Sequence, residues 1–287
     1  MTVGVRTWRS VLDEVRGILG SDADARWILE EASGYSRAEL IVRLDEPVTA
    51  RCGAYIASMV ERRLTGEPIQ YVLGRWGFRG LDLMVDRRVL IPRPETEEVV
   101  EWALAEARAL GRDELLVADL GTGSGAIALS LAKELPRATV WATDASPDAL
   151  DVARANTAGT GMWAATRVRL VEGEWWAALP PELRGRLDLV VTNPPYVADG
   201  EHLPPEVEEW EPRVALRAGP DGLAAAREVL AGAREWMGAG GVVVMEIAPA
   251  QAAAVVEFAT AAGAVSAEVR RDSSGRERAL VARWPRG

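Results

Sequence analysis

Residues 117–126 read Val-Ala-Asp-Leu-Gly-Thr-Gly-Ser-Gly-Ala, and this stretch decides the fold. Apolar residues lead into it as in a buried strand, and the apolar residues after Ala126 follow helical spacing. The glycines between strand and helix let the main chain turn tightly and approach a ligand closely. The helix start offers free N–H groups to that ligand. The candidate binding residues of this turn are Asp119, Gly121, Thr122, Gly123, Ser124 and Gly125.

A second acidic residue, Asp144, ends the next predicted strand. Its distance from the glycine turn is the one expected for a partner of a ribose hydroxyl. NAD and S-adenosylmethionine (SAM) both carry an adenosine ribose, so the pattern alone fits either cofactor. A tight turn that binds nothing is the third interpretation, and the two aspartates at strand ends argue against it.

Strands and helices alternate from about residue 115 onward. The predicted strands are 115–119, 139–143, 167–171, 187–192, 242–247, 267–271 and 279–283, and the predicted helices are 95–110, 126–134, 147–155, 223–237 and 250–262. This alternation builds a mainly parallel sheet with helices on both faces. A hairpin-type turn at residues 272–275 predicts that the last strand runs antiparallel. The result is an α/β fold with a Rossmann-like, seven-stranded sheet, which matches class I SAM-dependent methyltransferases by fold analogy.

The first 66 residues predict a small helical bundle. Apolar residues recur at helical spacing near 8–19, 22–32, 37–44 and 49–64, after serine or threonine caps. Strand-like stretches at 71–73, 77–78 and 81–85, separated by glycines, predict a β-hairpin. We therefore expect an N-terminal helical bundle at 1–66 that binds the substrate, a β-hairpin linker at 67–90 and a catalytic domain at 91–287.

The composition of the chain limits which partners the protein can bind. The chain has 287 residues and a net charge of −10, and such an acidic surface repels a phosphate backbone, so we expect no direct nucleic-acid binding. One cysteine, Cys52, which we expect in the core, permits no internal disulfide and suits the cytoplasm. The start of the chain does not resemble a signal peptide, and no apolar run approaches the ~20 residues of a membrane span. The single histidine, His202, gives no basis for a metal site.

The segment Asn193-Pro194-Pro195-Tyr196 directly follows the predicted strand 187–192. Ligands of open α/β sheets bind beyond the carboxyl ends of strands, so Asn193 should face the crevice at the glycine turn. The Asn193 side chain and the Pro194 carbonyl can accept both N–H bonds of a planar amino group and orient its lone pair toward an incoming methyl. Tyr196 can cover that group and exclude water. A plain proline turn is the alternative interpretation.

Further segments resemble the HemK/PrmC family of protein-(glutamine-N5) methyltransferases. They are residues 66–74, which read Gly-Glu-Pro-Ile-Gln-Tyr-Val-Leu-Gly, residues 89–97 with Pro-Arg-Pro-Glu-Thr-Glu, and parts of 205–223. The resemblance extends from about residue 7 to 283. It implies SAM as the cofactor and, as the substrate, the glutamine of the Gly-Gly-Gln motif in bacterial peptide chain release factors.

The same resemblance assigns roles to residues. It implies that residues 121–125 and Asp144 hold SAM and that Trp175 flanks the adenine. Glu174-Trp175-Trp176 fits the family pattern of an acidic residue, a tryptophan and an aromatic residue, but either tryptophan could instead belong to the core. The residues implied to bind the glutamine side chain are Asn193, Pro194, Pro195 and Tyr196. Three residues, Arg93, Pro94 and Glu95, either close over the methionine end of SAM or cap the following helix.

The roles of two further segments stay open at the level of the sequence. The family usually has Glu-Ile-Gly where this chain has Glu246-Ile247-Ala248, so a close main-chain approach at Ala248 is in doubt. The acidic loop at 197–219, which follows Tyr196, either lies at the substrate entrance or is a solvated surface loop.

We therefore predict a monomeric, cytoplasmic, SAM-dependent enzyme that methylates the glutamine side-chain amide of release factors, without a metal or a membrane. An amino methyltransferase acting on adenine N6 or guanine N2 is the alternative. A dinucleotide-dependent oxidoreductase would use the glycine turn but leave Asn193 to Tyr196 without a role. A non-enzymatic module that binds release factors would require that SAM does not bind.

Overall fold

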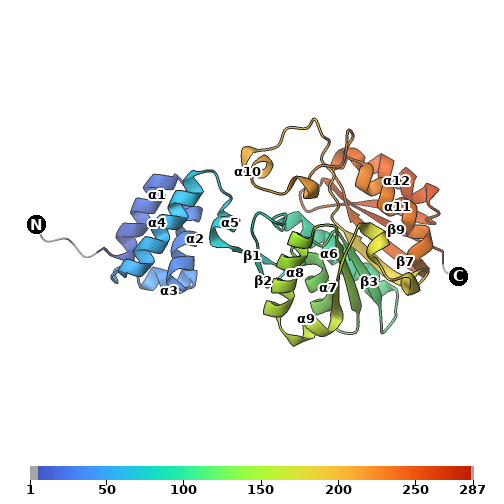
Figure 1. The fold of residues 1–287 in the computed structure, drawn as a ribbon, viewed down its shortest axis with the longest axis horizontal. Helices are drawn as coiled ribbons and strands as arrows, with labels where there is room; N and C mark the ends of the chain where they lie inside the picture. The colour runs from blue at the N-terminus through green and yellow to red at the C-terminus, as the bar shows by residue number, and fades with distance from the viewer. Residues whose placement is uncertain (1–5, 286–287) are drawn as a thin grey trace, which may run out of the picture. The chain divides into compact units, whose positions relative to one another are not determined.

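The computed structural model describes residues 6–285, which form two compact units (Figure 1). The first unit includes residues 6–75 and 204–210. The second contains residues 76–203 and 211–285. Residues 76–90 thus fold with the second unit, while the proposed functional boundaries at 66 and 90 stay predictions.

The first unit is helical. Its elements are α1 (Trp8–Leu19), α2 (Asp22–Ser33), α3 (Arg37–Val42), α4 (Ala50–Leu64), α5 (Ile69–Leu73) and α10 (Pro205–Glu208). A serine or threonine side chain caps each of the first four helices, and left-handed glycines end α1 and α2. Their buried apolar side chains, such as Val11, Ile28 and Met59, share one core. The predicted helical bundle is confirmed.

One predicted strand in this region is wrong, because residues 71–73 lie in α5. The short apolar run fits a strand or a helix by pattern alone. Ile69 and Val72, three residues apart, both bury against the helical core, and Gly74 ends the turn with a φ of 73°. Arg62 donates to the carbonyls of Tyr71 and Val72 in this last turn, at 2.8 and 3.0 Å.

Cys52 lies on α4 and is partly buried against this core. Its thiol donates to the Ala32 carbonyl at 3.4 Å, and it is a free cysteine. It packs as the small side chain that the sequence predicts.

The second unit is built on a seven-stranded sheet in the order β5-β4-β3-β6-β7-β9-β8. The strands are β3 (Leu116–Leu120), β4 (Thr139–Asp144), β5 (Val168–Glu172), β6 (Leu187–Thr192), β7 (Met237–Glu246), β8 (Ser266–Arg271) and β9 (Glu277–Arg283). All neighbouring pairs are parallel except those made by β9, which runs antiparallel to β7 and β8. The predicted fold class and the terminal reversal are confirmed.

A separate two-stranded sheet forms the predicted hairpin, from β1 (Arg75–Phe78) and β2 (Leu81–Met84). Arg79 and Gly80 connect the strands with φ of 45° and 66°. Two successive positive φ values are typical of the tight turns whose twist matches that of the flanking strands.

Helices cover both faces of the large sheet (Figure 1). They are α6 (Pro94–Ala109), α7 (Ala126–Glu134), α8 (Pro147–Thr160), α9 (Met162–Arg167), α11 (Ala224–Trp236) and α12 (Ala252–Ala261). Successive strand residues point to opposite faces, so Val117 packs in the core with α6 and α7 whereas Ala118 packs in the core with α11 and α12. Helix α9 is absent from the prediction because only Ala164 of its six residues is buried.

Strands β3 and β6 lie next to each other at the point where the strand order reverses, with β4 and β5 on one side and β7 on the other. In open α/β sheets, ligands bind beyond the carboxyl ends of strands at such a switch point. The glycine turn and Asn193 follow β3 and β6 directly, so the fold brings them to the same edge. Among residues 6–285, no helix has the length and apolar character needed to cross a membrane.

Candidate active site

The glycine turn after β3 is held by the neighbouring strand. The N–H groups of Gly121 and Thr122 both donate to the Thr143 carbonyl in β4, at 2.9 and 2.8 Å. Gly121 and Gly123 have φ of 76° and 55°, a left-handed conformation that residues with side chains rarely adopt. The turn therefore requires glycine and keeps a fixed shape.

Asp144 ties this turn to the start of α8. Its Oδ2 accepts from the Gly123 N–H at 2.8 Å, and its Oδ1 accepts from the Ser146 N–H at 2.9 Å. Burial raises the pKa of the Asp144 carboxyl, and the two main-chain donors oppose that rise. Each oxygen accepts one main-chain proton, so each keeps acceptor capacity for a second donor, such as a ribose hydroxyl.

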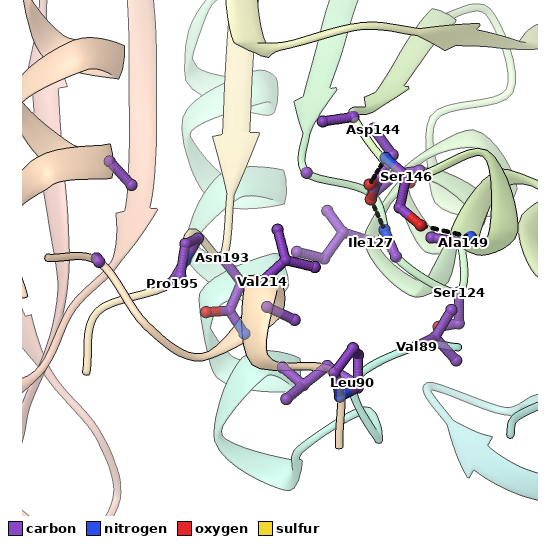
Figure 2. Close-up of a pocket in the computed structure, with 18 of the residues that line it drawn as sticks. Val89, Leu90, Ser124, Ile127, Asp144, Ser146, Ala149, Asn193, Pro195 and Val214 are labelled. Carbon is purple, nitrogen blue, oxygen red and sulfur yellow. Dashed lines mark hydrogen bonds between the residues drawn. The ribbon is translucent and has the colours of Figure 1, made fainter. Parts of the chain in front are cut away.

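A cavity of about 380 Å³ lies over the turn, within the range of small-molecule sites. Figure 2 shows Asp144 and Ser146 on one side of it and Asn193 and Pro195 on the other. Apolar side chains such as Leu90 and Val214 line it between them. The two motifs that the sequence singled out therefore face one cavity.

The Asn193 side chain is held from behind by a buried relay. Asn193 Nδ2 donates to Thr96 Oγ1 at 3.3 Å, and Thr96 Oγ1 donates to Glu246 Oε2 at 2.7 Å. Thr96 and Glu246 are only 4% and 1% exposed. Burial raises the pKa of Glu246 to about 7, against the opposing effects of Thr96 and Arg278.

The loop after Asn193 is fixed by Gln251, which is 7% exposed. Its Nε2 donates to the carbonyls of Tyr196 and Gly222, at 3.0 and 2.8 Å, and its Oε1 accepts from the Ala248 N–H at 3.2 Å. Ala248 has an ordinary φ of −74°, so alanine is unstrained there. The close main-chain approach lies instead at Gly222, where a β-carbon would be 2.4 Å from the Tyr196 carbonyl.

Tyr196 itself is half-buried and does not line the cavity. Burial and the nearby charge of Glu246 raise the pKa of its hydroxyl to about 12. The side chain therefore stays neutral at physiological pH and is not a general base.

The structure distinguishes the two adjacent tryptophans. Trp175 lines the cavity, and its ring lies 3.4 Å from the position of a β-carbon on Gly121. Trp176 is 7% exposed, donates to the Val229 carbonyl at 3.0 Å and stacks on Trp236 with 6.0 Å between ring centroids. Trp176 is thus a core residue, and of the two tryptophans only Trp175 lines the cavity.

Arg93 lines the cavity and pairs with Glu211, whose side chain is 1% exposed. Glu211 also accepts from the Ile91 N–H at 3.3 Å, and burial raises its pKa. This glutamate of the acidic loop is therefore internal rather than solvated. Pro94 and Glu95 are exposed in the first turn of α6, the position expected for helix capping rather than for contact with a ligand.

Asp119 lies behind the turn and does not line the cavity. Its Oδ2 accepts from Thr122 Oγ1 at 2.6 Å and from the Ala128 N–H at 3.0 Å, while its buried Oδ1 has no hydrogen-bond partner. Burial raises the pKa of this fully buried carboxyl to about 7. Asp119 braces the turn from outside the cavity lining.

Known proteins similar to this chain agree with the geometry. The PrmC N-terminal domain family matches residues 5–74, and the methyltransferase small domain family matches residues 106–208. A release factor glutamine methyltransferase of Burkholderia pseudomallei is 44% identical over 265 residues, which cover 91% of this chain and 92% of that protein. Another from Geobacter sulfurreducens is 39% identical over 96% of both chains.

The chain belongs to the release factor glutamine methyltransferase family. Among solved structures, a methyltransferase from Pyrococcus furiosus has a TM-score of 0.53 and 19% identity, covering 78% of this chain and 97% of that one. This second similarity concerns the fold alone. The family resemblance inferred from the sequence motifs is confirmed, and the cofactor of a SAM-dependent methyltransferase fits it.

The residues predicted for a family member separate into two groups in this structure. Those that line the cavity are Arg93, Gly121, Thr122, Gly123, Ser124, Asp144, Trp175, Asn193 and Pro195. Those outside the lining are Pro94, Glu95, Asp119, Gly125, Pro194 and Tyr196. The residues outside the lining form part of the turns, brace them or flank the residues that line the cavity.

Sequence reasoning missed many of the lining residues, among them Leu90, Thr96, Ser146 and Val214. Ser146 caps α8 and follows Asp144 closely, so the cap signal before Pro147 was available. Thr96 stands inside the segment that resembles the family. Leu90 lies in the same segment, whereas nothing local in the sequence marks Val214 as a cavity residue.

Proposed function

We propose that this protein transfers a methyl group from SAM to the side-chain amide nitrogen of the glutamine in the Gly-Gly-Gln motif of a release factor. One observation carries the proposal: Asn193 faces the same cavity as Asp144 and the glycine turn. The glycine turn at 121–125 and Asp144 form what we call the cofactor cradle. This cradle and a pair of acceptors for a planar amide nitrogen then belong to one site.

The residues of the cradle fit SAM. The left-handed glycines keep the main chain open toward the cavity, and side chains in their place would narrow it, since a β-carbon on Gly121 would already contact the Trp175 ring. Asp144 would accept from the ribose hydroxyls, and Trp175 would pack on the adenine. When bound, SAM supplies a sulfonium methyl group that needs no metal or covalent intermediate for its transfer.

The chain's own residues would prepare the nitrogen. An amide nitrogen is a poor nucleophile because its lone pair is delocalised into the carbonyl. Asn193 Oδ1 and the Pro194 carbonyl would each accept one N–H bond, which turns the lone pair toward the methyl carbon. Tyr196 remains neutral and would shield the reacting amide from water, and the proton released from the product passes to solvent.

The finer assignments also belong to this proposal. The helical bundle at 1–66 would contact the release factor, the hairpin at 67–90 would link it to the catalytic domain at 91–287, and the enzyme would act as a monomer in the cytoplasm. Light scattering of the purified chain checks the monomer, for which one 31.0-kDa copy is expected.

A methyl-transfer assay tests the function. Radiolabelled SAM is incubated with the protein and a release factor, and parallel reactions contain a release factor with alanine in place of the motif glutamine, an RNA or a DNA. Label in the intact release factor alone is expected. Label in nucleic acid instead would favour the amino methyltransferase alternative, although the net charge of −10 opposes it.

Calorimetric titration with SAM, NADH and NADPH separates the remaining classes. Binding of SAM alone is expected. Binding of a nicotinamide cofactor without SAM would instead support the oxidoreductase class.

A further inference from the structure

Thr96 and Glu246 form a relay behind Asn193, and neither has a role in the proposed reaction so far. Asn193 and Thr96 are 97 residues apart in the sequence, and Thr96 and Glu246 are 150 apart. Both members of the relay are almost fully buried, and Thr96 reaches the cavity lining itself. Such a buried polar cluster costs desolvation energy unless its hydrogen bonds offset that cost.

The direction of the relay follows from the chemistry of its members. Above its pKa of about 7, Glu246 is a carboxylate that only accepts hydrogen bonds, so it takes the single hydroxyl proton of Thr96. The Thr96 oxygen can then act toward Asn193 only as an acceptor. It therefore selects the Nδ2 side of the amide, which donates to it at 3.3 Å.

We propose that Thr96 and Glu246 are positioning residues that fix which way round the Asn193 amide stands, so that Oδ1 faces the substrate. The two ends of an asparagine amide have nearly the same shape, and packing alone distinguishes them poorly. The wrong orientation presents an N–H group to the substrate N–H group. The inference rests on the proposed function, in which Asn193 must accept a hydrogen bond.

Three substitutions separate polarity from packing. Thr96→Val keeps the shape of the side chain but removes the hydroxyl. Thr96→Ser keeps the hydroxyl and removes a methyl group. Glu246→Gln keeps the shape but adds an amide donor that can reverse the relay, so that Thr96 donates to Asn193 Oδ1.

Methyl transfer to a release factor at pH 8, where Glu246 is ionised, gives the first readout, with both substrates varied. For Thr96→Val and Glu246→Gln, kcat should fall about tenfold, the factor that corresponds to roughly 1.4 kcal/mol, or one misdirected hydrogen bond. The KM for the release factor and the affinity for SAM should change by less than about twofold, because the release-factor contacts and the SAM cradle are untouched. Thr96→Ser should keep most of the wild-type kcat. Equal losses in the valine and serine variants, or no loss in the valine variant, would overturn the inference.

The second readout does not depend on activity. The chain has only two asparagines, Asn156 and Asn193, so selective ¹⁵N labelling of asparagine side chains gives two NH₂ signals in the free protein. Asn156 is an internal control, because its Nδ2 donates to the carbonyls of Met84 and Ser124 at 3.0 and 2.8 Å. Thr96→Val and Glu246→Gln should speed hydrogen exchange of the Asn193 signal and leave the Asn156 signal unchanged, whereas Thr96→Ser should leave both unchanged.

The two readouts distinguish a failure of the proposed function from a failure of the relay. A wild-type protein that does not methylate the release factor contradicts the proposed function, while the exchange rates still decide the orientation of Asn193. Unchanged exchange at Asn193 in both the valine and the glutamine variant contradicts the relay, even if methylation is confirmed.

Discussion

Gln251 Nε2 donates a hydrogen bond of 3.0 Å to the main-chain carbonyl of Tyr196. The same nitrogen donates to the Gly222 carbonyl, so one buried side chain holds the loop after β6 against the loop before α11. The motif that ends at Tyr196 thus owes its position to a residue 55 positions later in the sequence.

Gln251→Ala should lower both stability and activity. It leaves the carbonyls of Tyr196 and Gly222 buried without their donor, which costs about 1–3 kcal/mol in the free energy of unfolding. The freed loop should also lower kcat for methyl transfer. Urea unfolding and steady-state kinetics measure the two effects, and alanine at Gln70, the chain's other glutamine, is the matched control. A kcat equal to wild type would show that the loop keeps its shape without Gln251.

Asp144→Ala should weaken SAM binding by about 1–3 kcal/mol, since a charged acceptor for the ribose hydroxyls is lost. Calorimetric titration with SAM measures the change. Asp144→Asn is the better-matched variant, because its side-chain oxygen can still accept one of the two main-chain N–H bonds that brace the turn. Unchanged affinity in a folded Asp144→Ala protein would mean that Asp144 does not bind the ribose.

Asn193→Ala should reduce kcat by up to about 100-fold, because a misplacement of ~1 Å at the reacting atom is enough for such a loss. SAM affinity should stay near wild type, since Asp144 and the glycine turn are unchanged. Asn193→Asp should retain more activity than alanine but less than asparagine. It keeps an acceptor oxygen but loses the Nδ2 donor to Thr96. Single-turnover methyl transfer with saturating SAM measures all three proteins, and full activity in the alanine variant would contradict the mechanism.

The sequence was enough to predict the elements of the site that directly follow strands. Asn193 comes immediately after β6 and the glycine turn immediately after β3, and parallel strands bring both to one edge of the sheet. Local patterns cannot predict side-chain contacts between distant segments. Thr96 contacts Asn193 only because α6 packs beside β6, and no periodicity in either segment predicts this contact.

Where the predicted and observed structures differ elsewhere, the local sequence pattern fits more than one structure. Residues 71–73 are an apolar run too short to distinguish a strand from a helical turn, and the core of the first unit selects the helix. Trp175 and Trp176 are neighbours of the same type, so sequence alone could not show which one is buried. The structure separates them, because Trp175 lines the cavity whereas Trp176 stacks on Trp236 in the core.

Asp119→Asn should stabilise the protein more at pH 8 than at pH 5. Burial raises the pKa of Asp119 to about 7, so the folded state binds a proton that the unfolded state has already released at pH 5. The contribution of Asp119 to stability is therefore complete below its ordinary pKa and is lost as pH rises through about 7.

Asparagine can place its oxygen where Oδ2 accepts from Thr122 and Ala128 while carrying no charge. The difference in unfolding free energy between variant and wild type should grow by roughly 2 kcal/mol from pH 5 to pH 8, since one pKa unit corresponds to about 1.4 kcal/mol. Urea unfolding at both pH values measures it, with Asp113→Asn as the control for loss of an exposed charge. A difference that stays constant between the two pH values would show that Asp119 is ionised in the folded protein throughout this range.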